Sequence, residues 1–224
     1  SGTIAFMEEW VDKNALNKHG ETEHFKRIVP ELNAMGQTPA KISVYEPMEK
    51  EDTGNVIFKR RSIRSFIKEK AVERDITERL LKAGMQAPSA RNKQPWEFLV
   101  LDKAEIIDSI AEIDSHFKLA AKAPLVIITL GNRKETYVGA DNAEWYPLDL
   151  SAATQNILLE AVNMGLGAVW IGCYPDEKRS AGLRNHFNLP EHIVPFSVIA
   201  AGYSEEASYF KDRFNADKIH FNKY

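Results

Sequence analysis

The chain has 224 residues, of which 44% are hydrophobic and 27% are charged, an ordinary composition for a folded globular protein. Lys and Arg number 29 against 32 Asp and Glu, and a net charge of −3 argues against a general nucleic-acid binder. The sequence has no apolar run near the roughly 20 residues that cross a bilayer, no signal-peptide pattern and only one cysteine, Cys173, so we expect a cytoplasmic protein without disulfides or a metal site.

Residues 1–52 differ from the rest and are predicted to form an N-terminal amphipathic helix followed by an extended arm. Apolar residues recur at helical spacing from Phe6 to Ala15, and Gly20 would end that helix. From Ile28 onward, prolines and Gly36 interrupt the pattern and predict little regular structure. An arm this rich in apolar residues needs a surface to lie on, which either the main body or a partner subunit could supply.

Residues 53–224 are predicted to form the main domain. A short helix is expected from an N-cap at Thr53 through the basic stretch, followed by a helix over 72–87 that Pro88 stops. Further strands are predicted over 96–102, 123–132, 168–174 and 194–203, and further helices over 103–113, 148–165 and 176–187. The helix from 148 is small or apolar on more than one face, which favours burial between layers or subunits. The irregular alternation indicates an α+β or three-layer domain.

The stretch KRRSIRSF, residues 59–66, concentrates positive charge at one short turn. On a helix, Arg60 and Arg64 would lie one turn apart on the same face, with Ser62 nearby. Guanidinium groups and a hydroxyl match the oxygens of a phosphate monoester. A solvated basic helix end explains the same residues, because the helix dipole favours cations at a C-terminus.

Two later segments favour a ligand. APSARNKQPWEF, residues 87–98, lies between a helix and a strand; its small residues would let a backbone approach a flat ligand, and Asn92 can both donate and accept hydrogen bonds. A plain connection with Trp96 filling the core is the alternative. GLGAVWIGCYP, residues 165–175, ends a strand whose free N–H groups could point at a ligand.

These three segments, in this order and spacing, resemble the FMN-dependent nitroreductase family, and DRFNADKIHFN, residues 212–222, is similar to its closing segment. The resemblance covers roughly residues 55–224 and leaves the N-terminal arm outside. It implies an α+β fold: a mixed sheet flanked by helices in three α/β/α layers, built as an intertwined homodimer. Two identical sites would lie at the dimer interface.

The resemblance also implies which residues bind the cofactor. The basic turn would bind the phosphate and ribityl region of FMN through Arg60, Arg61, Ser62 and Arg64. The following loop would reach FMN held mainly by the other subunit, through Pro88, Ser89, Ala90 and Asn92. The strand would present backbone N–H groups to flavin N5, from Trp170, Ile171 and Gly172. Near the C-terminus, Arg213 matches a second phosphate arginine.

The activity implied by the resemblance is hydride transfer from NAD(P)H via flavin to a nitroaromatic, quinone or similar acceptor, by a ping-pong mechanism. No catalytic acid or base is assigned. Three alternatives remain: a flavin-binding or storage protein without turnover, a fold relative acting as a dehalogenase or enoate-type reductase, and an RNA-binding protein that uses the basic turn. The net charge argues against the last of these.

Overall fold

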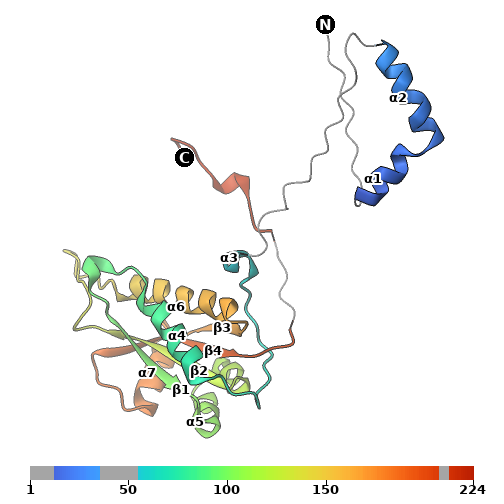
Figure 1. The fold of residues 1–224 in the computed structure, drawn as a ribbon. Coiled ribbons are helices and arrows are strands. Elements are labelled where there is room, and N and C mark those ends of the chain that lie inside the picture. The colour runs from blue at the N-terminus through green and yellow to red at the C-terminus, as the bar shows by residue number, and fades with distance from the viewer. Residues whose placement is uncertain (1–12, 36–54, 207–211) are drawn as a thin grey trace. The chain divides into compact units, whose positions relative to one another are not determined.

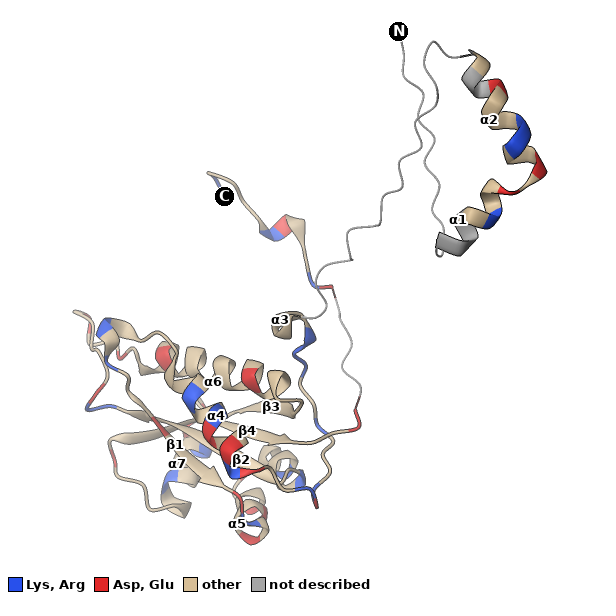
Figure 2. Ribbon diagram, in the orientation of Figure 1, with Lys and Arg blue, Asp and Glu red and all other residues tan. Residues whose placement is uncertain are grey.

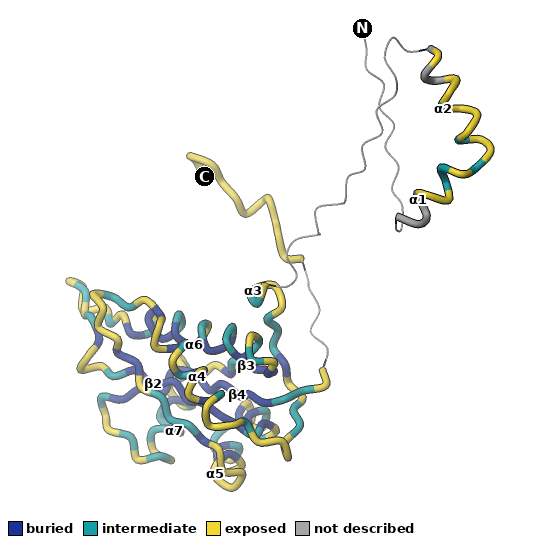
Figure 3. Tube along the Cα trace, viewed as in Figure 1, coloured by how far each residue is buried: buried dark blue, intermediate teal, exposed yellow. Residues whose placement is uncertain are grey.

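The computed structural model describes residues 13–35, 55–206 and 212–224. Contacts within the chain divide it into two units, Ser1–Glu49 and Lys50–Tyr224. The larger unit is a sheet with helices on both of its faces (Figure 1). It holds every buried residue among those described, as the dark blue tube in Figure 3 shows.

The smaller unit contains helices α1 (Lys13–Gly20) and α2 (Glu23–Met35). Gly20 ends α1 as predicted, whereas the predicted helix residues before Lys13 lie outside the described part of the chain. The prediction of an extended arm from Ile28 is wrong as far as Met35, because α2 continues through Pro30. A proline removes one helical hydrogen bond, and the good helix formers that follow it can maintain the helix.

The sheet of the larger unit has the strand order β1-β2-β4-β3, and its three ladders are antiparallel. The strands are β1 (Trp96–Leu101), β2 (Leu125–Asn132), β3 (Gly167–Gly172) and β4 (Ile193–Gly202). The central strands β2 and β4 are buried almost throughout, and for β2 the continuously apolar, β-branched sequence predicts this burial. We predicted a mixed sheet. Parallel pairing is present as an isolated bridge between Ser62 and Ala168, at the edge of the antiparallel strands.

Each face of the sheet packs on its own helices because side chains alternate along a strand. On one face, Ile127 and Ile199 join α4 (Arg74–Met85) and α6 (Tyr146–Asn163) in one apolar cluster. On the other, Val126 and Val198 pack with the helices on that side (Figure 1). These are α5 (Ala104–Ser109), η2 (Ile110–Glu112), η3 (Ser115–Lys122) and α7 (Glu177–His186). The predicted α+β fold with three layers is confirmed.

The short helix before the basic stretch differs from its prediction. Helix α3 spans only Val56–Lys59, and its N-cap is Asn55, whose side chain accepts a hydrogen bond from the Ile57 amide at 2.9 Å. The predicted N-cap at Thr53 is therefore wrong. So is the prediction that Arg60 and Arg64 share one helix face, because the helix ends before both. The chain is extended there because it pairs with the edge of the sheet.

Candidate functional site

The basic segment, residues 60–67, runs along the outer edge of the sheet. A parallel bridge joins it to Ala168 in β3, where the Ile63 amide donates to the Ala168 carbonyl at 3.0 Å. Further on, the Ile67 amide donates to the carbonyl of Tyr203, just after β4, at 2.9 Å. These contacts use backbone atoms, so they fix the path of the segment independently of most of its side chains.

Two predicted phosphate ligands influence one another electrostatically although they lie far apart in sequence. Burial lowers the pKa of Arg60, and the nearby positive charges of Arg213 and Arg61 lower it further. Arg213 is exposed. Like charges repel one another, and a bound anion would relieve this repulsion. Figure 2 shows the run of Lys and Arg that follows α3.

The other two arginines of the segment make hydrogen bonds to nearby carbonyls. Arg61 Nη1 donates to the carbonyls of Arg60 (2.9 Å) and Phe58 (3.3 Å), which closes the C-terminal end of α3. Arg64 Nη1 donates to the carbonyl of Ser62 at 3.1 Å. Arg61 is partly buried and Arg64 is exposed. Of these two, Arg64 therefore has the charge that a ligand in solvent can reach.

A carboxylate from the residues that follow β4 also holds this segment. Glu206 Oε2 accepts hydrogen bonds from the amides of Arg64 and Ser65, at 3.2 and 3.3 Å. Ser204 Oγ donates to the Ser65 carbonyl at 2.6 Å. Sequence reasoning missed Glu206, because no local pattern links two groups separated by 142 positions.

The second predicted segment is an exposed loop with unusual backbone angles. Helix η1 (Ala90–Asn92) contains Arg91 and Asn92 at φ of 54° and 55°, and Gln94 follows at φ 51°. Side chains stabilise this conformation: Ser89 Oγ accepts from the Gln94 amide, and Asn92 Oδ1 accepts from Gln94 Nε2, both at 2.9 Å. Pro88 and Asn92 are exposed, and Ser89 and Ala90 are partly buried. The exposed face of the loop is free to meet a ligand or another chain.

Asp149 holds the loop through a hydrogen bond from α6. Sequence reasoning did not identify this residue. It lies in the first turn of α6, is only 5% exposed, and accepts the Ala90 amide on Oδ1 at 2.9 Å. Burial raises the pKa of Asp149, and the bond from Ala90 partly offsets that rise. Within the described part of the chain, Oδ2 has no hydrogen-bond partner. An acidic residue near the start of an otherwise apolar helix was the available signal.

The third predicted segment, β3, has a free edge. Ala168 turns its carbonyl to the basic segment, away from β4. Backbone groups alternate between the two edges of a strand, so Trp170 and Gly172 turn their N–H groups the same way. Ile171 turns its N–H toward β4 instead. The three residues therefore differ: Trp170 and Gly172 present backbone donors at the edge, and Ile171 does not.

Gly172 is exposed, and a Cβ added to it would meet nothing within 4 Å. The chain's own packing therefore does not require glycine here, in contrast to Gly167 of the same strand. The next residue, Cys173, is buried, and burial raises the pKa of its thiol to about 12. At neutral pH this thiol is protonated and chemically inert.

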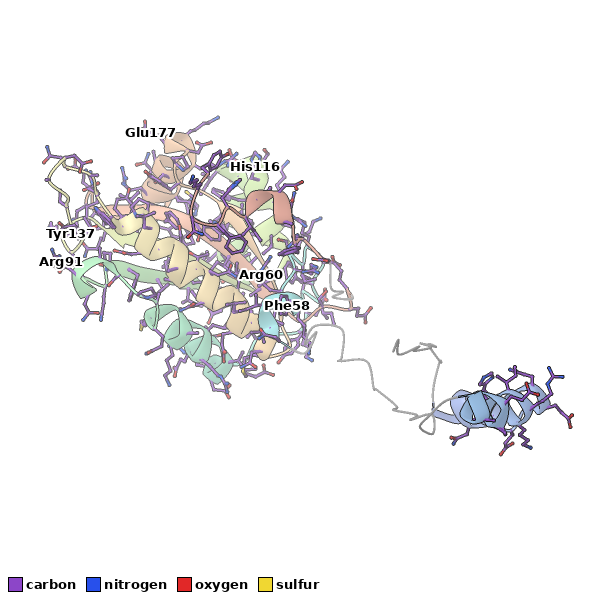
Figure 4. All side chains as sticks on the ribbon, turned by 90° about the horizontal axis from the view of Figure 1, so that it is seen from above. Phe58, Arg60, Arg91, His116, Tyr137 and Glu177 are labelled. Carbon is purple, nitrogen blue, oxygen red and sulfur yellow. The ribbon has the colours of Figure 1, made fainter. Side chains whose placement is uncertain are left out.

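Within one chain, the basic segment and the 88–92 loop lie at opposite ends of α6. The loop is tied to Asp149 in the first turn, whereas Val56 of α3 lines a hollow with Asn163 in the last turn. At about 1.5 Å per residue, these two turns are about 20 Å apart along the helix. Figure 4 shows the same separation: Arg91 lies beside Tyr137 at one end, and Arg60 lies near Phe58 at the other.

In the described residues, no helix is long and apolar enough to cross a membrane. A search of those same residues finds no group of three or more His, Cys, Asp or Glu side chains placed to hold a metal ion.

Comparison with known proteins gives consistent results. The family model described as Nitroreductase family matches residues 57–124 and 114–203. A protein of Archaeoglobus fulgidus, provisionally named NADH dehydrogenase/NAD(P)H nitroreductase, is 39% identical over 177 residues, covering 78% of this chain and 99% of that protein.

Two solved structures are similar over most of this chain. One, from Clostridium acetobutylicum, is provisionally named an NADH oxidase; it is 44% identical, covers 75% of this chain and 99% of its own, and has a TM-score of 0.70. The other, from Desulfovibrio desulfuricans, is provisionally named a nitroreductase and was solved in complex with FMN. It is 28% identical, covers 81% and 99% of the two chains, and has a TM-score of 0.66.

Proposed function

The chain belongs to the nitroreductase family, and on that premise we propose that it is an FMN-dependent oxidoreductase that uses NAD(P)H. The acceptors we propose are nitroaromatics, quinones or similar compounds, in a ping-pong reaction. The relative named NAD(P)H nitroreductase and the similar structure solved with FMN support the cofactor and the electron donor. Family membership confirms the resemblance that the sequence motifs indicated.

The described residues fit FMN in two respects. The positive charge of Arg213 contributes to the lowered pKa of Arg60, and a phosphate group carries the charge that would relieve this repulsion. The edge of β3 offers outward N–H groups beside an exposed glycine, with room for a flat ring to approach the backbone. When bound, FMN supplies the hydride chemistry, because neither amides nor arginine side chains can accept a hydride.

The chain's own residues then have separable roles. Arg60 and Arg213 bind the phosphate, with Arg61, Ser62 and Arg64 completing the basic turn. Trp170 and Gly172 donate backbone hydrogen bonds to the edge of the flavin ring. The cationic segment raises the local positive potential, which favours the negatively charged reduced state of a cofactor. We assign no side chain as an acid or base.

We further propose that the active protein is a homodimer with two shared sites. The 88–92 loop and the basic turn lie at opposite ends of α6, so one chain does not bring both sets around a single small cofactor. In a dimer, Pro88, Ser89, Ala90 and Asn92 of one subunit reach FMN held by the basic turn of the other. A flavin-loaded monomer in sedimentation at micromolar concentration contradicts this proposal.

Residues 1–52 are proposed to form an arm separate from the FMN-binding domain of residues 53–224. Of the side chains described in α1 and α2, none is buried. A segment with Phe25, Ile28 and Val29 needs an apolar surface, and we propose that it wraps the partner subunit without touching FMN. Deleting residues 1–50 should weaken the dimer and leave flavin bound. Retention of full dimer stability would exclude the wrapping, and loss of flavin from an intact dimer would assign the arm to the site instead.

The observation that carries the proposal is the basic segment that begins at Arg60 and runs along the open edge of β3, with the charge of Arg213 acting on Arg60. The first test is the visible spectrum of the purified protein, which should show the absorption bands of bound flavin. Stopped-flow mixing with NADH or NADPH should then bleach those bands, and a nitroarene or quinone should restore them. A protein that binds flavin without bleaching is a carrier. A colourless protein that takes up no added FMN refutes the proposal.

Reoxidation of the reduced flavin by a halogenated aromatic or an enoate, but not by nitroarenes or quinones, would place the protein with the dehalogenase or enoate-reductase relatives of the fold.

We also propose that the protein acts in the cytoplasm, on the basis of its single, buried thiol.

A further inference from the structure

A small hairpin, residues 133–145, joins β2 to α6 and lies outside the residues assigned above. Its two arms form an isolated antiparallel bridge, and the Trp145 amide donates to the Tyr137 carbonyl at 3.0 Å. Arg133 Nε closes the base of the hairpin by donating to both carboxylate oxygens of Glu144, at 2.8 and 3.0 Å. The hairpin is therefore a folded feature of the surface, and its backbone pairing gives its side chains defined positions.

The hairpin and the first turn of α6 surround a hollow of about 430 Å³. This volume lies within the range of about 300–1,000 Å³ that small-molecule sites occupy. Its large apolar side chains are Tyr137, Trp145 and Leu148, and the two rings meet edge to face with their centroids 5.8 Å apart. Trp145 is 41% exposed and Leu148 is 63% exposed. Large apolar side chains gathered on a surface in this way are typical of a place that a ligand or a partner covers.

The hollow adjoins the 88–92 loop, which is proposed above to reach FMN held by the other subunit. The guanidinium carbon of Arg91 lies 5.8 Å from the centre of the Tyr137 ring, and Figure 4 shows the two residues beside one another. Leu148 directly precedes Asp149, whose carboxylate holds the loop. In the proposed dimer the hollow therefore opens close to the flavin that the loop contacts.

The charges around the hollow favour an uncharged guest. The residues that line it include the carboxylates of Asp141 and Glu144 and no Lys or Arg. The nearby cations Arg133 and Arg91 lie against Glu144 and the Tyr137 ring. Asp141 is exposed, and its Oδ1 accepts a backbone amide at 3.2 Å. A guest with a carboxylate of its own would be repelled by Asp141, whereas a neutral aromatic ring gains stacked or edge-to-face contacts with the two rings.

We propose that this hollow is the acceptor subsite, and that it takes uncharged aromatic electron acceptors in preference to carboxylated ones. Trp145 and Leu148 contact the ring of the acceptor, and Asp141 disfavours anions. This inference rests on the proposed function, since it names the substrate class of the same shared site. The competing explanation is that the partner subunit covers Trp145 and Leu148, which would make the hollow a dimer contact only.

The probes are 4-nitrobenzyl alcohol and 4-nitrobenzoate, which share a nitroarene ring and differ in charge. The first readout is an NMR titration of the full chain as purified, and it requires no turnover. The indole N–H of Trp145 and the methyl groups of Leu148 should shift with the alcohol, and should shift less with the benzoate at the same concentration. The methyl groups of Ile106, exposed on α5, should not shift. Unshifted Trp145 and Leu148 signals with both probes overturn the proposal.

The second readout compares Leu148→Ala with a matched control, Ile106→Ala. Each residue is the third of its helix and is exposed, so neither truncation should alter the fold much. Leu148→Ala should raise KM for 4-nitrobenzyl alcohol about 3- to 10-fold, the effect of losing one apolar contact. The rate at which saturating NADH bleaches the flavin should stay unchanged. Ile106→Ala should change neither quantity, and equal changes in the two variants overturn the proposal.

Asp141→Asn tests the preference for uncharged acceptors. It keeps an oxygen that can accept the backbone amide and removes the negative charge. KM for 4-nitrobenzoate should therefore fall about 2- to 5-fold, the scale of one exposed charge interaction, while KM for the alcohol stays the same. An unchanged ratio of the two KM values refutes the selection against anions.

Two further outcomes separate the proposal from its alternatives. If Leu148→Ala weakens the dimer in sedimentation and leaves KM for the alcohol unchanged, the hollow is a subunit contact and the proposal is overturned. If NADH does not bleach bound flavin in the unmodified protein, the proposed function fails instead. The NMR titration still decides in that case whether the hollow binds an uncharged aromatic ring.

Discussion

The basic segment and the 88–94 loop are both assigned to FMN, but they are held in opposite ways. The basic segment is tied to β3 and to Tyr203 through backbone hydrogen bonds, to which the side chains of Glu206 and Ser204 add further bonds. The loop has positive φ angles at three residues and depends on side chains, above all on the buried carboxylate of Asp149. Backbone ties survive substitution of most side chains, whereas side-chain ties do not.

Because they are held differently, the two segments are expected to respond differently to mutation. Changing an arginine in the basic segment should affect ligand binding and leave the fold intact. Changing the anchor of the loop should affect the fold first and the ligand second. The predictions below test this difference, from the largest expected effect to the smallest.

The largest effect is expected for the phosphate cations. Arg60→Ala and Arg213→Ala should each weaken FMN binding by about 1.5–3 kcal/mol, the scale of hydrogen bonds to charged groups, without lowering stability much. Fluorescence titration with FMN measures the first quantity and urea unfolding the second. Arg74→Ala, which loses only an exposed pair with Glu78, is the control. Unchanged flavin occupancy after dialysis of both variants would refute the assignment.

Two glycines of β3 allow the effect of a mutation on stability to be separated from its effect on FMN binding within a single strand. A Cβ on Gly167 would stand 2.6 Å from Cγ2 of the buried Ile63, so Gly167→Ala should lower stability by about 1–3 kcal/mol and loosen the basic segment. Gly172→Ala should change stability by less than about 0.5 kcal/mol, because its Cβ meets no neighbour.

The Gly172 variant should nevertheless bind FMN less tightly, because the extra methyl would occupy the space into which the ring approaches. Thermal unfolding and flavin titration of the two variants measure both effects. If Gly172→Ala binds FMN with undiminished affinity, the ring does not lie against this part of the strand.

The loop anchor gives the next effect. Asp149→Ala leaves the Ala90 amide without its acceptor and should lower stability by about 1 kcal/mol, the typical value of one hydrogen bond. Asp149→Asn keeps a carbonyl oxygen at that position and should lose less. Urea unfolding compares the three proteins. Equal losses in the two variants would show that the negative charge, and not the acceptor, holds the loop.

The smallest expected effect is a dependence of the free energy of unfolding on pH, with a sign set by Asp149. Burial raises the pKa of Asp149 above its ordinary value of 3.8, so the folded protein binds this proton more tightly than the unfolded chain does. The stabilisation tied to the proton is complete below the unfolded-state pKa and is lost as pH rises through the folded-state pKa. Between about pH 4 and pH 7, the wild type should therefore lose stability relative to Asp149→Asn. A gap between the two that stays constant over this range would contradict the shift.

Much of the site could be predicted from sequence because its motifs are local. The stretches around Arg60, Ser89 and Gly172 indicated the family, and the comparisons confirm that family. Which of these residues touch FMN stays a prediction. Sequence reasoning missed Asp149 and Glu206, because each acts on a segment that only folding brings near, although the position of Asp149 at the start of an apolar helix was a local signal.

The sequence by itself determined the layers of the main domain. A continuous apolar run predicted the buried strand β2. The small and apolar faces of residues 148–165 indicated a helix buried on several sides, as Leu150, Ala153 and Ile157 of α6 are. Local composition is sufficient there because burial follows directly from apolar side chains.

Only the tertiary structure decided where α3 stops and which N–H groups of β3 are free. Helix α3 ends at Lys59 because the next residues pair with Ala168, a partner more than a hundred positions away. Strand order and edge position likewise follow from long-range pairing, which costs chain entropy and is repaid only by the whole packed sheet. That is why one short stretch of sequence led to a wrong prediction of the backbone geometry of its arginines, while their assignment to FMN stays a prediction.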